Sequence, residues 1–239
     1  MSGRALETGG ACETGKLAAA KAAVELVKDG MLLGLGSGST VRVFIDLLAE
    51  RVRRENLSLV FCSTSLDTSF YAASKGLREV PLGEDPPDLA VDGADLVLPD
   101  RTLIKGGGAA HFREKIIDYF SREFVVIVDE TKVAETAPSS VSVPLEVHPM
   151  AVRQVVRRLR ELAEVRGVQV RASSGGKLGP VVTDNGNLVL DVVLEGVEDW
   201  QEEEVRMKLI PGVLESGIFA LRKPDKILIG TGSGTTLFI

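Results

Sequence analysis

The chain has 239 residues, of which 44% are hydrophobic, 26% charged and 5% aromatic, so it can bury a substantial core in one domain or slightly more. Its formal net charge of −6 argues against a nucleic-acid partner, because such proteins need a basic face that displaces counterions. Cys12 and Cys62 fit neither a disulfide framework nor a metal-ligand spacing, and we expect spectator thiols in a reducing compartment. With no apolar run of the length of a membrane span or signal peptide, a cytoplasmic protein is expected.

Strands and helices alternate through the first part of the chain. Helical spacing predicts helices over residues 16–28, 39–56, 65–76 and 113–122, and apolar runs predict strands over residues 31–36, 57–64, 87–95 and 123–130. The strands are almost continuously apolar, which is typical of a parallel sheet that is covered on both faces. The sequence therefore predicts a doubly wound α/β domain that occupies residues 1–141 and regains residues 218–239 as strands, with a turn over residues 230–236.

Prolines and hydroxyl residues interrupt this pattern over residues 136–150 and indicate a domain boundary. Beyond it, the sequence predicts an Arg-rich helix (151–167), a strand (168–173), a hairpin around Asn185-Gly186 (179–194) and a second helix (199–212). This order is typical of a small α+β unit of the split βαβ type. We assign it to residues 142–217.

The first stretch with chemical content is GLGSGST, residues 34–40, between a predicted strand and a predicted helix. Backbone amides freed by glycine, hydroxyl groups and a helix N-terminus form a phosphate cradle without net positive charge. The stretch lacks the lysine of a Walker loop and the glycine spacing of a dinucleotide fingerprint. An ordinary turn with a helix cap at Ser39 or Thr40 explains the same residues, so both interpretations stay open.

Two further stretches carry charged residues. Asp92 and Asp95 follow an apolar strand at the edge where open α/β sheets bind ligands, although an Asp-Gly turn gives the same pattern. In IKGGGAAHFREK, residues 104–115, three glycines allow close approach of the backbone, and a helix is predicted directly after them. Lys105 precedes the glycines and Glu114 falls in the early turns of the helix. A flexible loop followed by a surface helix is the alternative.

Together, these stretches place a phosphate cradle, carboxylates and a lysine at the strand ends of one sheet. The set contains no nucleophile paired with a base, no metal cluster and no nicotinamide motif. Proton transfer on a phosphorylated small molecule requires an acid-base carboxylate and a cation that holds an oxyanion, and the set offers both. The sequence therefore favours an enzyme with this chemistry.

Six motifs resemble, in order and spacing, those of the type A ribose-5-phosphate isomerases: GLGSGST, VDGAD, IKGGGAAHFREKI, PLEVHPMA, VVTDNGNLVLDV and IPGVLESGIFA. The resemblance implies interconversion of D-ribose 5-phosphate and D-ribulose 5-phosphate without a metal or organic cofactor, in the non-oxidative branch of the pentose phosphate pathway. It also implies a Rossmann-like, mostly parallel main domain, a ferredoxin-like α+β lid, and a homodimer or homotetramer.

By this resemblance, Glu114 is the base that moves a proton between the first two carbons of the sugar through an enediolate. Lys105, with Asp95 beside it, steadies the oxyanion, and Asp92 assists ring opening. The substrate and phosphate contacts that the resemblance implies are Lys16, Ser37, Gly38, Ser39, Thr40, Gly106, Gly107, Gly108 and Lys132.

Three features fall outside the motifs. Leu96 stands where the family usually has a glutamate, which removes a supporting contact but none of the four catalytic side chains. His111 is not part of the family motif, and we expect it at the surface. The Arg-rich stretch over residues 157–166 is expected to be a solvated helix face.

Two other functional classes account for fewer motifs. A sugar-phosphate sensor domain of bacterial repressors requires an N-terminal helix-turn-helix of about 60 residues and a basic patch, whereas only a short segment precedes the first predicted helix. A related amino-sugar-phosphate isomerase or deaminase requires a histidine-assisted ring-opening site, and both histidines lie outside the glycine and acid residues of the motifs.

Overall fold

The computed structural model describes residues 3–173, 175 and 178–239, which form two compact units. Unit 1 takes in the described residues up to Ala94 together with Arg113–Val133 and Pro224–Ile239, and unit 2 takes in Asp95–Phe112 and Ala134–Lys223. This division differs from the predicted boundaries, chiefly because residues 95–112 belong to unit 2. Of their two short strands, the one at residues 103–104 pairs with the one at residues 96–97 and with a strand from residues 218–219, and no local sequence pattern indicates the second pairing.

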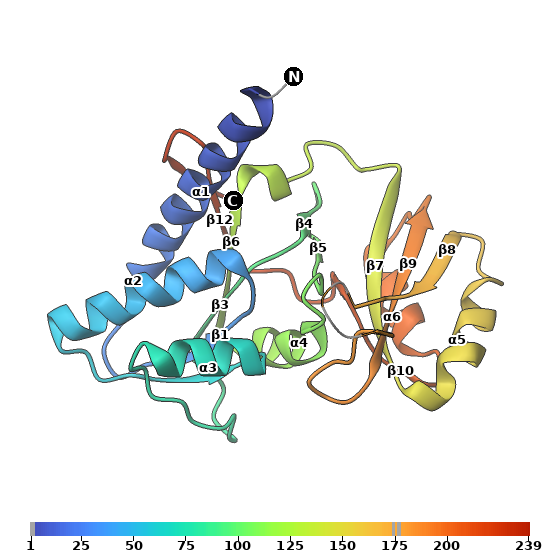
Figure 1. Cartoon of the computed structure of the whole chain (residues 1–239), viewed down its shortest axis with the longest axis horizontal. Helices are drawn as coiled ribbons and strands as arrows, with labels where there is room; N and C mark the ends of the chain where they lie inside the picture. The colour runs from blue at the N-terminus through green and yellow to red at the C-terminus, as the bar shows by residue number, and fades with distance from the viewer. Residues whose placement is uncertain (1–2, 174, 176–177) are drawn as a thin grey trace. The chain divides into compact units, whose positions relative to one another are not determined.

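Unit 1 is built around a six-stranded sheet (Figure 1). Its strands are β1 (Leu32–Leu35), β2 (Val60–Ser63), β3 (Leu89–Asp92), β6 (Glu123–Asp129), β12 (Lys226–Gly230) and β13 (Thr236–Phe238). They lie in the order β13-β12-β6-β3-β1-β2, and neighbouring strands run parallel except at β12 and β13. The predicted mostly parallel sheet is therefore confirmed.

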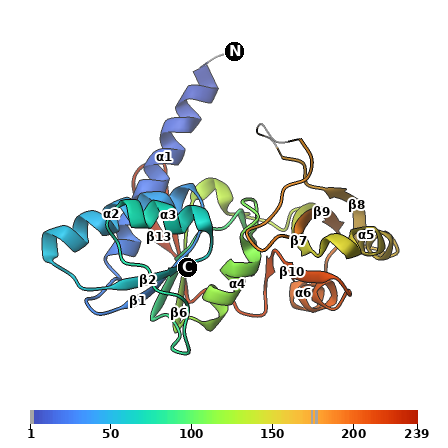
Figure 2. The same cartoon turned by 60° about the horizontal axis from the view of Figure 1, so that its bottom comes forward.

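Helices cover both faces of this sheet. They are α1 (Gly3–Val24), α2 (Ser39–Glu55), α3 (Leu66–Ser74), α4 (His111–Phe120) and the 3-10 helix η1 (Glu130–Lys132). The first two residues of α4 belong to unit 2. Leu33 and Leu35 join side chains of α1 and α2, which lie side by side in both views, in one buried cluster (Figures 1 and 2). Between them, Gly34 faces the other side of the sheet, where Ile117 of α4 lies against it. The arrangement is the doubly wound fold that the alternating pattern predicts.

Helix α1 is longer than its sequence indicates. It begins at Gly3, whereas the predicted helix covers residues 16–28. Glycine-rich segments of this kind have low helix propensity. Within the added turns Gly15 lies against Gly230 and Ala11 against Gly232, while residues 10, 11, 13 and 14 are exposed. None of the helices formed by the described residues is long and apolar enough to cross a membrane. The predicted turn before β13 is confirmed by a hydrogen bond from Thr231 N to Thr235 O at 2.8 Å.

Unit 2 contains two antiparallel sheets. Its strands are β4 (Leu96–Val97), β5 (Leu103–Ile104), β7 (Ser140–Val147), β8 (Val165–Val170), β9 (Leu188–Glu195), β10 (Val213–Ser216) and β11 (Ile218–Phe219), and its helices are η2 (Pro149–Ala151), α5 (Val152–Leu159) and α6 (Trp200–Lys208). One sheet has the order β10-β7-β9-β8 and the other the order β11-β5-β4. The chain order β7-α5-β8-β9-α6-β10 with this strand order is the predicted split βαβ, ferredoxin-like arrangement. Val155, Leu159 and Met207 from the helices pack in its buried core.

Two local predictions in unit 2 had different outcomes. The hairpin is confirmed, because Thr183 N donates to Asn187 O at 2.9 Å around Gly186, whose φ is 79°. The Arg-rich helix over residues 151–167 is wrong in length, since α5 ends at Leu159. The residues from Val165 onward pair with β9 instead, where strand pairing outweighs their helical pattern.

Candidate active site

The carboxylate of Asp92 anchors the loop that follows β1. Asp92 ends β3 and is fully buried, and its Oδ1 accepts hydrogen bonds from Ser37 N at 3.0 Å and Gly93 N at 2.6 Å. A Cβ on Gly36 would lie 1.9 Å from the same oxygen, so only glycine allows the loop to approach this closely. Asp92 therefore has a structural role, because it fixes the start of the predicted phosphate loop.

The loop ends at the N-terminus of α2 without a side-chain cap. Gly38 occupies the N-cap position with a φ of 111° and ψ of 175°, and no side chain bonds to the first amides of the helix. The predicted cap by Ser39 or Thr40 is therefore wrong, because glycine takes the cap position and the hydroxyl residues already lie within the helix. The amides of an uncapped first turn are donors at the positive end of the helix dipole, which favours the phosphate-cradle interpretation.

A cluster of hydroxyl groups holds Ser37 from the other side. Its Oγ lies 2.8 Å from both Thr64 Oγ1 and Ser65 Oγ, and Thr68 Oγ1 donates to Gly36 O at 2.7 Å. Thr64, Ser65 and Thr68 are all buried. Sequence reasoning missed this cluster, although its signal was present as consecutive hydroxyl residues at the carboxyl end of β2. The cluster fixes the orientation of Ser37. Because Gly36 N donates to Val91 O and Ser37 N to Asp92, the amides that remain for a ligand are those at the start of α2.

The two lysines expected at the phosphate both lie in unit 1. Lys16 of α1 is largely buried, and its Nζ lies 2.9 Å from Glu13 Oε1. The hydrogen bond to Glu13, with a smaller contribution from Asp129 at the end of β6, raises the pKa of Lys16 despite desolvation. Lys132 ends η1 and is half-buried. Both side chains thus lie on elements beside the carboxyl end of β6, in the unit that carries the loop.

Lys105 of unit 2 is almost completely buried, with 2% of its surface exposed. Its backbone N donates to Gly217 O at 2.9 Å, and its Nζ lies 5.4 Å from the centre of the Phe219 ring. Such a position allows a cation-π interaction, which is stronger when the cation is desolvated. The lysine is therefore held by backbone and ring contacts directly before the three glycines.

His111 is fully buried, so the expectation that it lies at the surface is wrong. The reason is the conformation of the glycine loop. Gly106 has a φ of 102°, and a Cβ at this position would lie 2.6 Å from His111 Nδ1, so the loop folds directly against the imidazole. Gly107 N then donates to Oδ2 of Asp95 at 2.6 Å. The imidazole and this exposed carboxylate therefore line the two ends of one tight loop.

Glu114 lies in the first turn of α4 and is 5% exposed. The helix begins at His111, two residues before the predicted range of 113–122. It does not begin directly after the glycines, because Ala109 has a φ of 61° and still belongs to the loop. Its neighbours Lys115 and Asp118 are buried as well. The alternative of a surface helix is therefore excluded for these residues, and the chain places a buried carboxylate nine residues after the buried lysine.

The cysteines are free, and burial raises the pKa of Cys62 to about 11, so its thiol stays neutral at pH 7. This agrees with the predicted spectator role. Among the described residues, no group of three or more His, Cys, Asp and Glu side chains is arranged to hold a metal ion.

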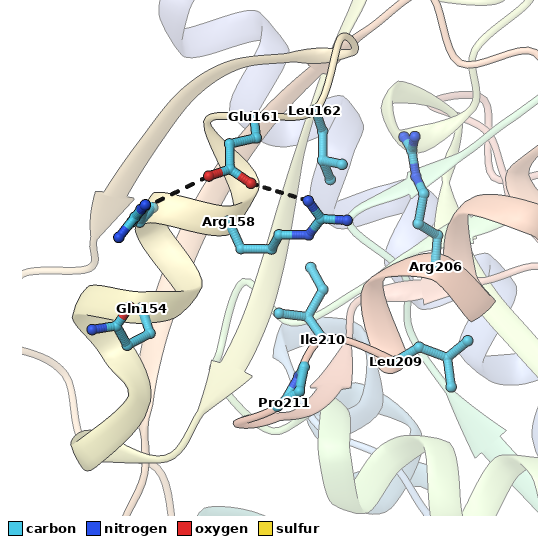
Figure 3. A pocket seen from close by; sticks show the side chains of 9 residues that line it. Gln154, Arg158, Glu161, Leu162, Arg206, Leu209, Ile210 and Pro211 are labelled. Atoms are coloured by element: carbon cyan, nitrogen blue, oxygen red, sulfur yellow. Dashed lines mark hydrogen bonds and ion pairs between the residues drawn. The ribbon is translucent and has the colours of Figure 1, made fainter.

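A separate hollow of about 590 Å³ lies between α5 and α6 in unit 2 (Figure 3). Arg157 and Arg158 border it and are 79% and 60% exposed, and Glu161 pairs with both, at 3.8 Å and 3.0 Å. The solvated face expected for this stretch is confirmed in these residues. None of the predicted site residues lines the hollow.

The comparisons with known proteins agree on one family. The family model for ribose 5-phosphate isomerase A (phosphoriboisomerase A) matches residues 60–234. A ribose-5-phosphate isomerase A of Methanococcus maripaludis is 45% identical over 218 residues, which cover 90% of this chain and 89% of the relative. One from Methanothermobacter thermautotrophicus is 47% identical over 219 residues, or 92% of this chain and 95% of the relative.

Solved structures give the same result. The ribose 5-phosphate isomerase A of Methanocaldococcus jannaschii is 43% identical, with a TM-score of 0.87 over 94% of this chain and 97% of that chain. A D-ribose-5-phosphate isomerase in complex with phospho-erythronic acid is 37% identical, with a TM-score of 0.89 over 96% of this chain and 98% of that chain.

Fold and matches together define an enzyme that isomerises an aldose to a ketose. The chain belongs to the ribose 5-phosphate isomerase A family, and the isomerisation of ribose 5-phosphate is its activity.

Proposed function

We propose that this isomerisation proceeds through an enediolate, with Glu114 as the base. The observation that carries the proposal is the burial of the Glu114 carboxylate in the first turn of α4, directly after the glycine loop. A carboxylate that is shielded from water is suited to a proton transfer for which water would otherwise compete.

The proposed steps balance as follows. The Glu114 carboxylate takes the proton from C2 of the open-chain aldose, and the electron pair of that bond forms the enediolate. The resulting carboxylic acid returns the proton to C1, while the hydroxyl proton on O2 passes to O1. Negative charge develops on the oxygens during these steps, and the ammonium of Lys105 stabilises it.

The two aspartates have supporting roles in this mechanism. Asp95 accepts from Gly107 N and so holds the glycine loop beside Lys105. Asp92 assists ring opening and the movement of protons between the oxygens, in addition to holding the loop after β1. Gly106, Gly107 and Gly108 allow the backbone to approach the sugar.

The phosphate is proposed to bind at residues 37–40, where the uncapped amides of α2 donate to it and Lys16 and Lys132 neutralise its charge. Phosphate binding positions the sugar for the proton transfer. The proposal extends to a homodimer or homotetramer that needs no metal ion and acts in the non-oxidative branch of the pentose phosphate pathway, which rests on the sequence resemblance.

The experiment that tests the mechanism follows the substrate hydrogen in D₂O. Ribose 5-phosphate that carries tritium at C2 is converted, and the label is measured in the product and in the solvent. An enediolate with a carboxylate base predicts loss of part of the tritium to the solvent and uptake of deuterium at C1. Complete retention of the tritium at C1 under all conditions indicates a direct hydride shift and contradicts the proposal.

A further inference from the structure

Arg171, the residue directly after β8, reaches the glycine loop with its guanidinium group. Its Nη1 donates to Gly106 O at 2.7 Å and to Gly107 O at 3.0 Å. All of these residues belong to unit 2. No motif of the sequence drew attention to this arginine, which is 65 residues away from Gly106 in the chain.

The remaining donors of the same guanidinium are fixed by Asp191 of β9. Nε donates to Asp191 Oδ2 at 3.0 Å, and Nη2 donates to Oδ1, so the pair is bidentate. Both side chains are mostly shielded from solvent, at 18% and 16% exposed. The arginine backbone is also held on both sides, since Arg171 N donates to Val189 O and Arg171 O accepts from Val181 N, each at 2.8 Å. Because the guanidinium is planar and its Nε and Nη2 are bonded to Asp191, its Nη1 can donate in one direction only, toward the glycine loop.

The glycine loop needs such a partner. Three consecutive glycines have a large conformational freedom to lose when they are ordered, and Gly107 and Gly108 are exposed. Asp95 holds the loop through the amide of Gly107, and Arg171 holds it through the carbonyls of Gly106 and Gly107. Hydrogen bonds therefore hold the loop through one of its amides and through two of its carbonyls.

We infer that Arg171 is a positioning residue of the isomerase: it orders the glycine loop and thereby fixes the position of the Lys105 side chain next to it. Its charge is compensated by Asp191, so it acts by position and adds little net charge. The inference rests on the role proposed for Lys105 above. An error of about 1 Å in the position of a catalytic group costs up to about a hundredfold in rate, which sets the scale of the effect.

The test compares Arg171→Ala with a matched control, Arg166→Ala. Arg166 lies on β8, pairs with Glu195 of β9 at 2.9 Å, donates to the carbonyl of Ala163 and is half exposed. It has the same kinds of partners but contacts no part of the loop. For Arg171→Ala we expect kcat to fall about tenfold to a hundredfold, with KM changed by about threefold at most. Arg166→Ala should leave both constants within about twofold of the parent enzyme.

Hydrogen exchange provides a readout that a general loss of stability does not reproduce. The peptide that covers residues 104–112 should exchange faster in folded Arg171→Ala, whereas peptides from β7 and β9 keep their protection. Arg171→Lys retains a charge beside Asp191 but cannot serve a carboxylate and two carbonyls at once, so it should recover only part of the lost kcat. If Arg171→Ala does not fold, Arg171→Met combined with Asp191→Asn removes the pair without leaving a lone buried charge, and the same measurements apply.

Three results would overturn the inference: an unchanged kcat with unchanged exchange of the loop, an equal loss of kcat in Arg166→Ala, or full recovery in Arg171→Lys. The variant Lys105→Met separates this failure from a failure of the proposed mechanism. If Lys105→Met is fully active, the role of Lys105 is refuted, and the inference that rests on it is overturned too. If Lys105→Met is impaired while Arg171→Ala is not, only the positioning role is refuted.

Discussion

Replacement of Lys105 by methionine separates the electrostatic role of this lysine from its place in the fold. Methionine has a similar length and volume, and the hydrogen bond from the backbone N of residue 105 to Gly217 O does not depend on the side chain. The Nζ is buried and lies 5.4 Å from the centre of the Phe219 ring, so the change removes a desolvated cation and a cation-π contact of about 1 to 2 kcal/mol. It also removes the desolvation cost of the charge, which acts on stability in the opposite direction.

The effect on catalysis should be much larger. Loss of one donor to a developing oxyanion costs about 3 kcal/mol of transition-state stabilisation, which corresponds to about 150-fold in kcat/KM. The assay measures the initial rate of ribulose 5-phosphate formation, and circular dichroism monitors thermal unfolding. The control is Lys223→Met, which removes a lysine of unit 2 that binds Asp100. A folded Lys105→Met enzyme with kcat/KM within about threefold of the parent would refute the proposed oxyanion role.

Three further predictions follow from the site. Glu114→Gln preserves the shape of the side chain but removes its basicity, so kcat should fall by about two to four decades while an unreactive substrate analogue still binds. The control is Glu161→Gln, at an exposed carboxylate. A Glu114→Gln variant that keeps a tenth of the parental turnover, or an equal loss in the control, would exclude the base role. Gly36→Ala forces a methyl group into the Asp92 carboxylate, so chemical denaturation should report a loss of about 1 to 3 kcal/mol in the free energy of unfolding, and an unchanged value would show that the loop relaxes freely. Turnover should survive exhaustive treatment with EDTA, and its abolition with recovery on addition of a divalent ion would contradict the metal-free mechanism.

Local patterns predicted most of the fold in unit 1. The strands β1, β3 and β6 are short apolar runs with buried side chains, and the helix α2 has its apolar positions at helical spacing, so each element can be recognised within its own segment. The boundaries of α1 and α5 could not be predicted in the same way. The end of α5 depends on strand pairing with residues far away in the chain, and the start of α1 lies in a glycine-rich segment whose residues have low helix propensity.

The candidate site shows the same limit at the level of single residues. Its motif residues could be named from the sequence, since glycine, lysine and carboxylate occur there at a characteristic spacing. The burial of His111 depends on the positive φ of Gly106, and the contacts of Arg171 depend on a strand of unit 2 that follows the loop by some 65 residues. Neither conformation nor long-range contact is encoded in a local pattern of polarity.

The missing side-chain cap on α2 has a thermodynamic consequence. A serine or aspartate at an N-cap stabilises a helix by about 1 kcal/mol relative to alanine and by a few tenths of a kcal/mol relative to glycine, so Gly38 costs the helix little and leaves its first amides without a side-chain acceptor. In the proposed binding mode the substrate phosphate accepts from these amides and takes the place of a cap, so substrate binding should stabilise the folded state as well as position the sugar. The melting temperature of the enzyme should consequently rise with the concentration of the phosphorylated ligand, and the resting enzyme is the less stable of the two forms.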